Sequence, residues 1–399
     1  MVLNQYKKNN IFLIVVAVIS VFELAIFFHF PLLSSIRKEF QVSESSIQLS
    51  AVFNVCGIGI SSLIYGGLSD SYGRKRIFLF GILCFTISSY SLSFINSIHA
   101  LLYLRLIQGV GAGISYSISN AILSDIYKGI EFKKAIMTMN VIIGMVIMLS
   151  PVFGGYISNV MGWRYSFKLI SCFGFLLFIY SVFFLPETLQ SKKIIIDWRD
   201  ILKNYLELLK NKHYLRFLII KVLVVSIAFV NITNLPLLFI ETYNISLTTC
   251  GFVMSLGSFI FVIGGLVCNT LVRYFNVNSI IKYSLCLVLS SSVMLIIVEF
   301  LSALTPLSIQ LIKIPYLLGI ACIFTNATKE IIGAVSTLSG SASAIMIALE
   351  MFVSSIAIKL VSIFYNGTIY PIEVYAIIMT AISFLFLMQE SSKDNDLIF

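Results

Sequence analysis

Apolar stretches of about 20 residues recur from one end of the chain to the other, separated by short polar segments. A helix of that length crosses the hydrocarbon core of a bilayer, and runs this continuous suit helices rather than the alternating strands of a membrane barrel. The pattern predicts an all-α membrane protein with twelve spans. These spans are expected at residues 10–33, 45–67, 77–96, 101–126, 135–158, 165–186, 214–240, 248–272, 279–301, 306–328, 340–364 and 370–389.

One long polar segment, between Glu187 and Tyr214, divides six predicted spans from six. It includes a short amphipathic stretch from Trp198 to Leu209. A transporter whose two halves rock around a site near the middle of the membrane needs two such bundles. We therefore expect an N-terminal six-helix bundle at 1–189, a cytoplasmic linker at 190–213 and a C-terminal six-helix bundle at 214–399.

The composition agrees with lipid as the main solvent of this chain. Hydrophobic residues make up 59% of the 399 positions and charged residues 11%, whereas a soluble protein carries roughly 25% charged residues. The net charge of +9 does not indicate nucleic acid as a partner, because the basic residues sit in short loops and not in stripes with interleaved aromatic residues.

Lysine and arginine gather on alternate loops, which predicts an orientation through the positive-inside rule. The predicted outer loops hold only Arg37, Lys38 and Arg164. We therefore expect both termini in the cytoplasm. The predicted inner segments hold Lys7, Lys8, Arg74, Lys75, Arg76, Lys128, Lys133, Lys134, Lys192, Lys193, Arg199, Lys203, Lys210, Lys212, Arg273, Lys282, Lys329 and Lys393.

Spans two and three are joined by the run Gly66-Gly67-Leu68-Ser69-Asp70-Ser71-Tyr72-Gly73-Arg74-Lys75-Arg76. Glycines permit a tight turn and close helix approach, and Asp70 can accept hydrogen bonds from a helix N-terminus or pair with the basic residues. The alternative is a solvated loop that only sets topology. The candidate gating residues are Gly66, Asp70, Gly73, Arg74 and Lys75.

Span four contains the run Arg105-Leu106-Ile107-Gln108-Gly109-Val110-Gly111. An arginine in an apolar helix faces a wet cavity or a counter-charge, unless its side chain reaches the membrane edge. Arg105 and Gln108 are therefore candidates for a substrate cavity.

Span five contains the run Ser150-Pro151-Val152-Phe153-Gly154-Gly155. Pro151 is expected to kink the helix, and Gly154 and Gly155 permit close packing against a neighbour. Helix packing alone is a sufficient explanation of this run.

The first two runs resemble the loop signature G-x-L-x-D-x-x-G-R-K/R and the span-four signature R-x-x-Q-G-x-G of the major facilitator superfamily. The third is similar to the G-P-x-x-G-G motif of its drug/proton antiporters, with Ser150 before the proline and Val146 where an upstream glycine often stands. Four more segments resemble the bicyclomycin/chloramphenicol-resistance (Bcr/CflA) group. They are Gly162-Trp163-Arg164-Tyr165-Ser166-Phe167, Leu185-Pro186-Glu187-Thr188-Leu189, Asn326-Ala327-Thr328 and Ser339-Gly340-Ser341-Ala342-Ser343-Ala344.

This resemblance runs through nearly the whole chain and is stronger in the N-terminal half. It implies the major facilitator fold, a bacterial inner membrane, and antiport driven by a proton gradient, with no other cofactor and no metal; we expect a monomer. Two departures leave drug specificity open. Thr325 replaces the proline that usually precedes Asn326, and Phe27-Phe28-His29-Phe30 replaces an acidic-rich pattern ahead of Pro31.

Proton coupling needs a group that exchanges a proton for substrate, and a carboxylate in a low-dielectric site can hold a proton near neutral pH. Glu23 lies near the centre of span one with no compensating charge beside it in sequence, so it is the first candidate. The alternative for Glu23 is a structural glutamate paired with a polar neighbour. Glu350, in span eleven, is the second candidate and the only other acidic residue that we expect so deep.

Several other polar residues are candidates for the substrate cavity. Lys221 in span seven and Lys313 in span ten can recognise an anionic group, although we expect both to snorkel to a membrane interface. His29 can assist proton transfer from Glu23 or lie at the membrane edge. The remaining candidates are Asn54, Asn120, Asn140 and Asn231.

The leading hypothesis is a secondary transporter that exports a small amphipathic compound, such as a drug, a siderophore or another metabolite, in exchange for protons. Proton-coupled uptake of a nutrient is the alternative, and a sensor that binds without transporting is a further one. An enzyme is disfavoured, because His29, His99 and His213 form no metal-ligand pattern and no activated nucleophile is evident. An ATP-driven pump is disfavoured by the lack of a G-x-x-x-x-G-K-[S/T] loop.

Overall fold

The computed structural model describes residues 5–189, 198–301, 304–335 and 339–388. All of its described secondary structure is helical, and eleven helices are long and apolar enough to cross a membrane. A twelfth span is counted when α12 (Pro306–Ile312) and α13 (Ile314–Gly333), which meet at 48°, are taken as one broken helix. The predicted all-α membrane fold is confirmed.

The helices of the first half follow the predicted spans and extend beyond most of them. Span four is divided at Gly113 into two helices that together form one span. The seven helices are α1 (Gln5–Phe40), α2 (Glu44–Tyr72), α3 (Arg74–Leu92), α4 (Ile98–Ala112), α5 (Ile114–Ile126), α6 (Gly129–Met161) and α7 (Trp163–Phe184).

The second half begins after the predicted linker, which lies partly outside the described residues, as do Lys192, Lys193 and Lys393. The amphipathic stretch forms α8 (Trp198–Leu208), and span seven ends in a π-helical turn, η1 (Leu238–Thr242). The other helices are α9 (Lys212–Leu237), α10 (Leu247–Leu271), α11 (Val277–Phe300), α14 (Ser339–Phe364) and α15 (Tyr370–Met388).

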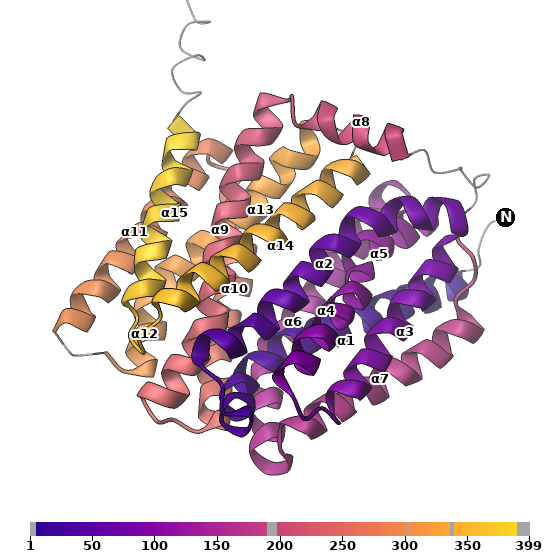
Figure 1. Ribbon diagram of the computed structural model, residues 1–399. Coiled ribbons are helices and arrows are strands. Elements are labelled where there is room, and N and C mark those ends of the chain that lie inside the picture. The colour runs from indigo at the N-terminus through magenta and orange to yellow at the C-terminus, as the bar shows by residue number, and fades with distance from the viewer. Residues whose placement is uncertain (1–4, 190–197, 302–303, 336–338, 389–399) are drawn as a thin grey trace, which may run out of the picture.

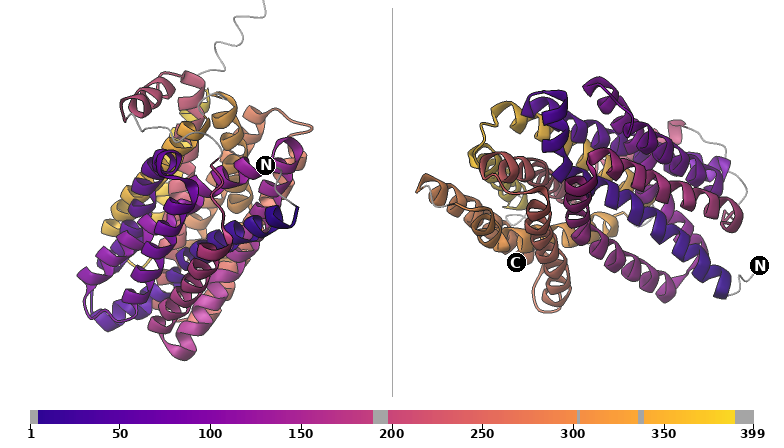
Figure 2. Two further views of the ribbon diagram at one scale, coloured as in Figure 1. Left: turned by 90° about the vertical axis from the view of Figure 1, so that its right-hand side faces the viewer. Right: turned by 90° about the horizontal axis from the view of Figure 1, so that it is seen from below.

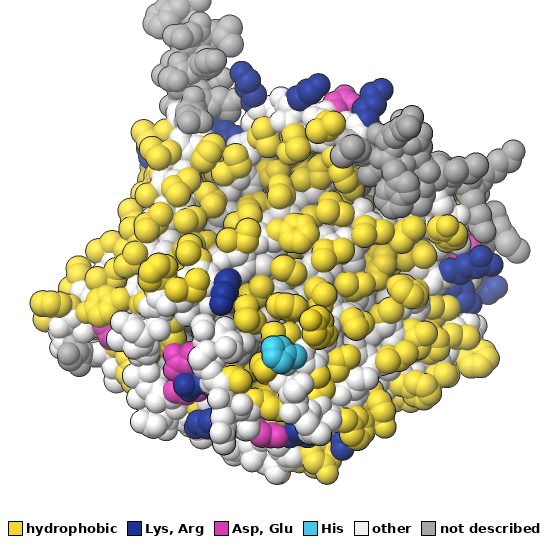
Figure 3. Space-filling view, in the orientation of Figure 1, with side chains coloured by type: hydrophobic (Ala, Val, Ile, Leu, Met, Phe, Trp, Pro, Cys, Tyr) yellow, Lys and Arg dark blue, Asp and Glu magenta, His cyan; other side chains and the backbone are white. Residues whose placement is uncertain are grey.

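The two halves of the chain form two groups of helices that lie side by side (Figure 1). The same arrangement is visible in the turned views, with α8 at one end of the molecule (Figure 2). We call this the α8 end. Hydrophobic side chains cover the middle of the face shown in Figure 3, and most charged side chains lie toward its ends, as expected of a surface in contact with lipid.

Two glycines make the tightest turns between spans. Gly73, between α2 and α3, has a φ of 101°, and Gly162, between α6 and α7, has a φ of 87°. L-residues with a side chain rarely adopt these values, so glycine is required at both positions. Other helices begin at side-chain caps, such as Ser43, which accepts a hydrogen bond from the Ser46 backbone N–H.

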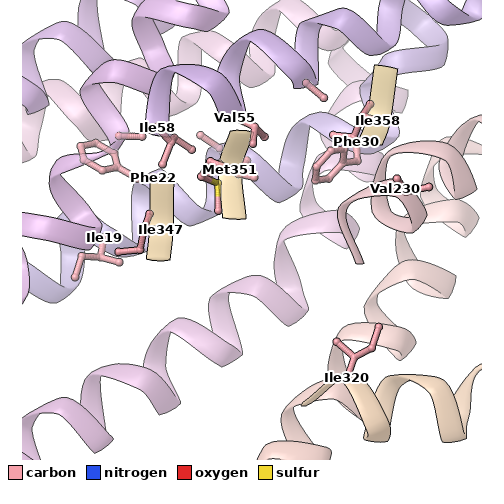
Figure 4. Close-up of a cluster of buried hydrophobic side chains, with 14 of the residues drawn as sticks. Ile19, Phe22, Phe30, Val55, Ile58, Val230, Ile320, Ile347, Met351 and Ile358 are labelled. Atoms are coloured by element: carbon pink, nitrogen blue, oxygen red, sulfur yellow. The ribbon is translucent and has the colours of Figure 1, made fainter. Parts of the chain in front are cut away.

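The halves meet where α2 packs on α14. Figure 4 shows buried side chains from both halves in this region: Phe22 of α1, Val55 and Ile58 of α2, and Ile347 and Met351 of α14. A side chain added at the neighbouring Gly59 of α2 would contact α14 directly. An apolar contact made largely without hydrogen bonds allows two packed bodies to move relative to each other.

Close helix packing within the first half depends on Gly109 of α4. A Cβ atom at Gly109 would overlap the Asn54 carbonyl of α2, whereas at Gly265 of α10 the same atom would meet open space. Replacing glycine by alanine stabilises either helix by about 0.5–1 kcal/mol. At Gly109 the added methyl group also overpacks the contact with α2, which destabilises the folded protein by about 1–3 kcal/mol. We expect Gly109→Ala to lower the melting temperature in detergent and Gly265→Ala to maintain or raise it. Equal melting temperatures of the two variants would contradict this packing.

Candidate functional site

A network of buried polar side chains links α2, α3 and α4 in the first half. The Arg105 side chain is 1% exposed. Its Nε donates to the Ser50 carbonyl at 3.5 Å and its Nη1 to Gln108 Oε1 at 2.5 Å. Gln108 in turn donates to Ser89 Oγ at 2.7 Å, and Asn54 donates to the Arg105 carbonyl at 3.1 Å. Three predicted cavity residues, Arg105, Gln108 and Asn54, are therefore brought together.

His29 extends this network to α1. Its side chain is buried, and its Nε2 lies 2.9 Å from Ser50 Oγ. On the same stretch of α2, Gln48 donates a buried hydrogen bond of 2.9 Å to Asn234 Oδ1 of α9 in the other half. Gln48 lies two positions before Ser50 on α2, so the network lies beside a polar contact between the halves.

Arg105 forms no ion pair with any residue that the structure describes. Its guanidinium is held by neutral oxygens, which stabilise its orientation without neutralising its charge. A buried cation of this kind attracts an anion or a carboxylate that arrives with a ligand. Its burial shows that Arg105 does not reach the membrane edge, and its place in a substrate site stays a prediction.

Glu23 lies on α1 and is 5% exposed. The preceding residue, Phe22, packs on Phe85 of α3 with ring centroids 4.2 Å apart. Glu23 is therefore buried within the first half. Its role in proton coupling stays a prediction.

In the second half, Lys221 of α9 pairs with Glu350 of α14. Lys221 Nζ lies 2.7 Å from Glu350 Oε1 and 3.1 Å from Met346 Sδ. The ammonium also lies 4.4 Å from the centre of the Phe324 ring of α13. The carboxylate is its one strong partner, because a thioether and an aromatic face are weak acceptors.

A second buried ion pair lies at the break between α12 and α13. Lys313, the residue between the two helices, pairs with Glu373 of α15 at 2.7 Å and donates to Asn231 Oδ1 of α9. Asn231 donates to the Tyr316 hydroxyl at 2.6 Å. A broken helix frees backbone groups in the membrane, and here Ser291 of α11 donates to the Ile312 carbonyl at 2.6 Å. Side chains of three neighbouring helices thus hold the break.

Two expectations about these residues are wrong. Lys221 and Lys313 do not snorkel, because both side chains are 1% exposed and paired with carboxylates. Glu350 is not the only deep acidic residue besides Glu23, because Glu373 is 0% exposed. The sequence does show Glu373 as an acidic residue inside the last apolar span, three positions after the predicted start of that span.

The candidate gating loop is bound to the end of α7. The Arg74 and Lys75 backbone N–H groups donate to the Glu187 carboxylate, and Lys75 Nζ donates to the Val182 carbonyl at 2.8 Å. Arg74 pairs with Asp70 at 2.6 Å and with Asp125 of α5 at 3.4 Å. These contacts tie the first turn of α3 to α2, α5 and α7.

The predicted roles within this loop are only partly right. Glu187 accepts hydrogen bonds from the N-terminus of α3, whereas the described partner of Asp70 is the Arg74 side chain. Gly73 makes the predicted tight turn, but a Cβ atom at Gly66 would meet nothing within 4 Å, so Gly66 is not at a close helix contact.

The antiporter-type motif lies where α6 of the first half crosses α10 of the second. A Cβ atom at Gly155 would overlap the Leu247 carbonyl, and one at Gly251 would overlap the Pro151 carbonyl. Gly154 packs in the same way on Phe28 of α1. The hydroxyl of Ser150 bonds within its own helix to the Val146 carbonyl at 2.5 Å. The motif therefore allows close backbone contact between the halves.

An ionic cluster joins the halves at the end opposite α8. Arg37 of α1 pairs with Glu241 of η1 in the other half and lies 3.6 Å from Glu44 of α2. One arginine thus faces two carboxylates, one from each half. Neither Glu44 nor Glu241 was singled out from the sequence, because residues at the ends of spans resemble ordinary loop charges.

Two predicted cavity residues lie apart from these clusters. Asn120 of α5 and Asn140 of α6 are exposed on the surface of the structure. No group of three or more His, Cys, Asp or Glu side chains that could hold a metal ion occurs among the described residues.

Comparison with known proteins agrees with this architecture. The sequence model of the Major Facilitator Superfamily matches residues 13–358. The chain is 23% identical over 405 residues to a bicyclomycin resistance protein homolog of Haemophilus influenzae, with 98% of this chain and 100% of that protein covered. It is 25% identical over 174 residues to multidrug resistance protein D of Escherichia coli, with 43% of this chain and 44% of that protein covered.

Among solved structures, the xylose transporter XylE from E. coli, in a partially occluded inward open conformation, has a TM-score of 0.72. The sequence identity is 16%, and 96% of this chain and 98% of that chain are covered. This likeness shows the fold. The relatives confirm the resemblance to the bicyclomycin-resistance group.

The buried pair Lys313–Glu373 can be compared with the surface pair Lys8–Glu131, whose Glu131 side chain is 56% exposed. Glu373→Gln leaves an ammonium buried without its counter-charge, which destabilises a protein by about 3–5 kcal/mol. Glu131→Gln is expected to change stability by about 1 kcal/mol or less. Thermal unfolding in detergent measures both. Lys313→Met combined with Glu373→Gln should recover most of the loss; a double variant as unstable as Glu373→Gln would contradict the pairing.

Proposed function

The chain belongs to the Major Facilitator Superfamily, and from this premise we propose that it is a proton-coupled antiporter that exports a small amphipathic compound by alternating access. Its family and fold are those of membrane transporters, not of enzymes. The names of its relatives, a bicyclomycin resistance protein homolog and a multidrug resistance protein, favour a drug as cargo, and a siderophore or another metabolite is the alternative. A bacterial inner membrane is the proposed location.

The observation that carries the proposal is the buried carboxyl group of Glu23. Burial in a membrane helix makes a carboxyl group costly to ionise, so Glu23 is suited to hold a proton near neutral pH and release it when its surroundings change. In the proposed cycle Glu23 binds a proton from the outside and loses it to the inside, and substrate moves in the opposite direction. The proton gradient is the energy source.

Each half supplies different groups to the proposed substrate path. The first half contributes the cation Arg105 with Gln108, Asn54 and His29 around it. The second half contributes Lys221 beside Glu350. Glu350 is the second candidate for proton coupling, because its carboxylate already has a counter-charge. An amphipathic substrate would place a polar group in this region and its apolar body against the surrounding aromatic residues.

The conformation described here is proposed to be closed toward the outside. The predicted orientation places both termini and α8 in the cytoplasm, so the contacts between halves at Arg37–Glu241 and Gly155–Leu247 lie at the outer end. The helices of residues 1–189 and 214–399 are the proposed rocking bodies. Opening to the outside would have to break the Arg37–Glu241 pair.

Proton coupling is tested in proteoliposomes that contain an internal pH dye, with an imposed proton gradient and a panel of drugs, siderophores and amino acids. We expect a compound to trigger proton flux in the wild type and no flux in Glu23→Gln, because glutamine cannot carry a proton across. Substrate binding should persist in the variant. Transport into inverted vesicles but not into right-side-out vesicles would identify export.

Glu131→Gln is the control for this experiment, because Glu131 is an exposed carboxylate on the surface of α6. It should keep the proton flux of the wild type. A Glu23→Gln variant that still couples proton flux to substrate would contradict the role of Glu23 and make Glu350 the next residue to test.

The outer contact is tested by Glu241→Gln, with Glu44→Gln as its matched control. Both carboxylates face Arg37, but the Glu241 pair joins two halves and the Glu44 pair lies within one half. We expect Glu241→Gln to increase labelling of an outer-end cysteine by a membrane-impermeant maleimide. The substitution removes a contact that stabilises only the state closed toward the outside. Glu44→Gln should change the labelling little. Equal labelling in the two variants would contradict the gate.

A further inference from the structure

A cavity of about 890 Å³ lies in the first half, outside the candidate transport path. It is formed by the start of α1, the start of α3, the end of α5 and the segment that follows α7. This is the end of the bundle where the chain begins, and it is also where the candidate gating loop is bound. Its lining includes Tyr6, Lys7, Lys75, Asp125, Phe183 and Glu187.

The acidic groups that line the cavity are already engaged. Asp125 pairs with Arg74 at 3.4 Å and accepts a hydrogen bond from Thr188 at 3.3 Å. The Glu187 carboxylate accepts backbone hydrogen bonds at the N-terminus of α3. The charge of Asp125 is balanced by Arg74, whereas the backbone N–H groups hold the Glu187 carboxylate without neutralising it.

The two basic groups that line the cavity outnumber the one carboxylate without a described counter-charge, Glu187. Lys75 Nζ donates to a neutral partner, the Val182 carbonyl, at 2.8 Å. Lys7 is exposed and has neither a hydrogen bond nor an ion pair among the described residues. The cavity therefore presents two ammonium groups to whatever occupies it, and this favours an anion.

The rim of the cavity is apolar and aromatic. Tyr6 is 80% exposed and Phe183 is 75% exposed, and both lie at the ends of membrane helices. Aromatic side chains at this depth are typical of the zone between lipid headgroups and acyl chains. An occupant with an anionic head and an apolar tail contacts both the lysines and the apolar rim, whereas a free phosphate ion contacts the lysines alone.

We propose that this cavity binds the phosphate headgroup of an anionic phospholipid, with Lys7 and Lys75 as the anion-binding residues and Tyr6 and Phe183 against the acyl chains. Basic groups beside a membrane surface attract anionic lipid. Because Lys75 follows Arg74 in the gating loop, bound lipid would hold α1 and α3 together at this end. The proposal does not depend on which compound is transported.

The test uses the full-length protein in nanodiscs of phosphatidylcholine with increasing phosphatidylglycerol, and bound phosphatidylglycerol is counted by native mass spectrometry after release. We expect Lys7→Gln and Lys75→Gln each to weaken retention of the lipid about fivefold, the effect of one lost surface cation. Lys133→Gln with Lys134→Gln is the matched control, because these exposed lysines of α6 do not line the cavity. A melting curve of each variant verifies folding.

Two outcomes would overturn the proposal. If the Lys133 and Lys134 variant loses as much lipid as the cavity variants, the attraction is a general effect of positive charge. If soluble glycerol phosphate displaces the lipid at comparable concentration, the cavity is a phosphate site and the aromatic rim has no role. If Lys75→Gln does not fold, Lys7→Gln alone tests the proposal. The Lys7 side chain makes no hydrogen bond or ion pair among the described residues, so its replacement removes no structural contact of this kind.

Discussion

A charged side chain inside a membrane needs a partner or a function, and this constraint accounts for most of the arrangement of the two halves. In the second half each buried lysine is matched by a carboxylate, Lys221 by Glu350 and Lys313 by Glu373. In the first half Arg105 is matched only by neutral oxygens among the described residues. The buried lysines of the second half are therefore neutralised, whereas the first half buries two charged side chains, Arg105 and Glu23, and Arg105 has no ion pair in the described part of the chain.

The two halves also contact each other through few polar groups. They meet through apolar side chains of α2 and α14 and through backbone contacts that glycine permits between α6 and α10. Few polar groups have to be separated when such surfaces slide. Those described include Gln48–Asn234, Arg37–Glu241 and the hydrogen bond from Ser355 to the Val52 carbonyl. This combination suits a transporter, because the barrier between two closed states stays low while each half remains rigid.

The sequence predicts the fold well, because apolar length alone marks a span. It predicts less about the site. The depth of Arg105 and Glu23 follows from the surrounding apolar run, but their neighbours depend on helix rotations that hydropathy does not fix. Lys313 shows the limit: the broken helix that buries it is invisible in the pattern, so a snorkelling lysine was the simpler expectation. Glu373 was overlooked because it lies near a predicted edge, where acidic residues are usually solvated.

The central claim is that protonation of Glu23 drives the two halves between states closed at opposite ends. Double electron–electron resonance between spin labels tests it most directly, with one pair at Lys38 and Thr249 and another at Tyr72 and Tyr274, after replacement of the exposed native cysteines. Lowering the pH is predicted to shorten the first distance, to lengthen the second, and to have neither effect in Glu23→Gln. Distances that do not change, that change together, or that respond equally in Glu23→Gln would contradict the account.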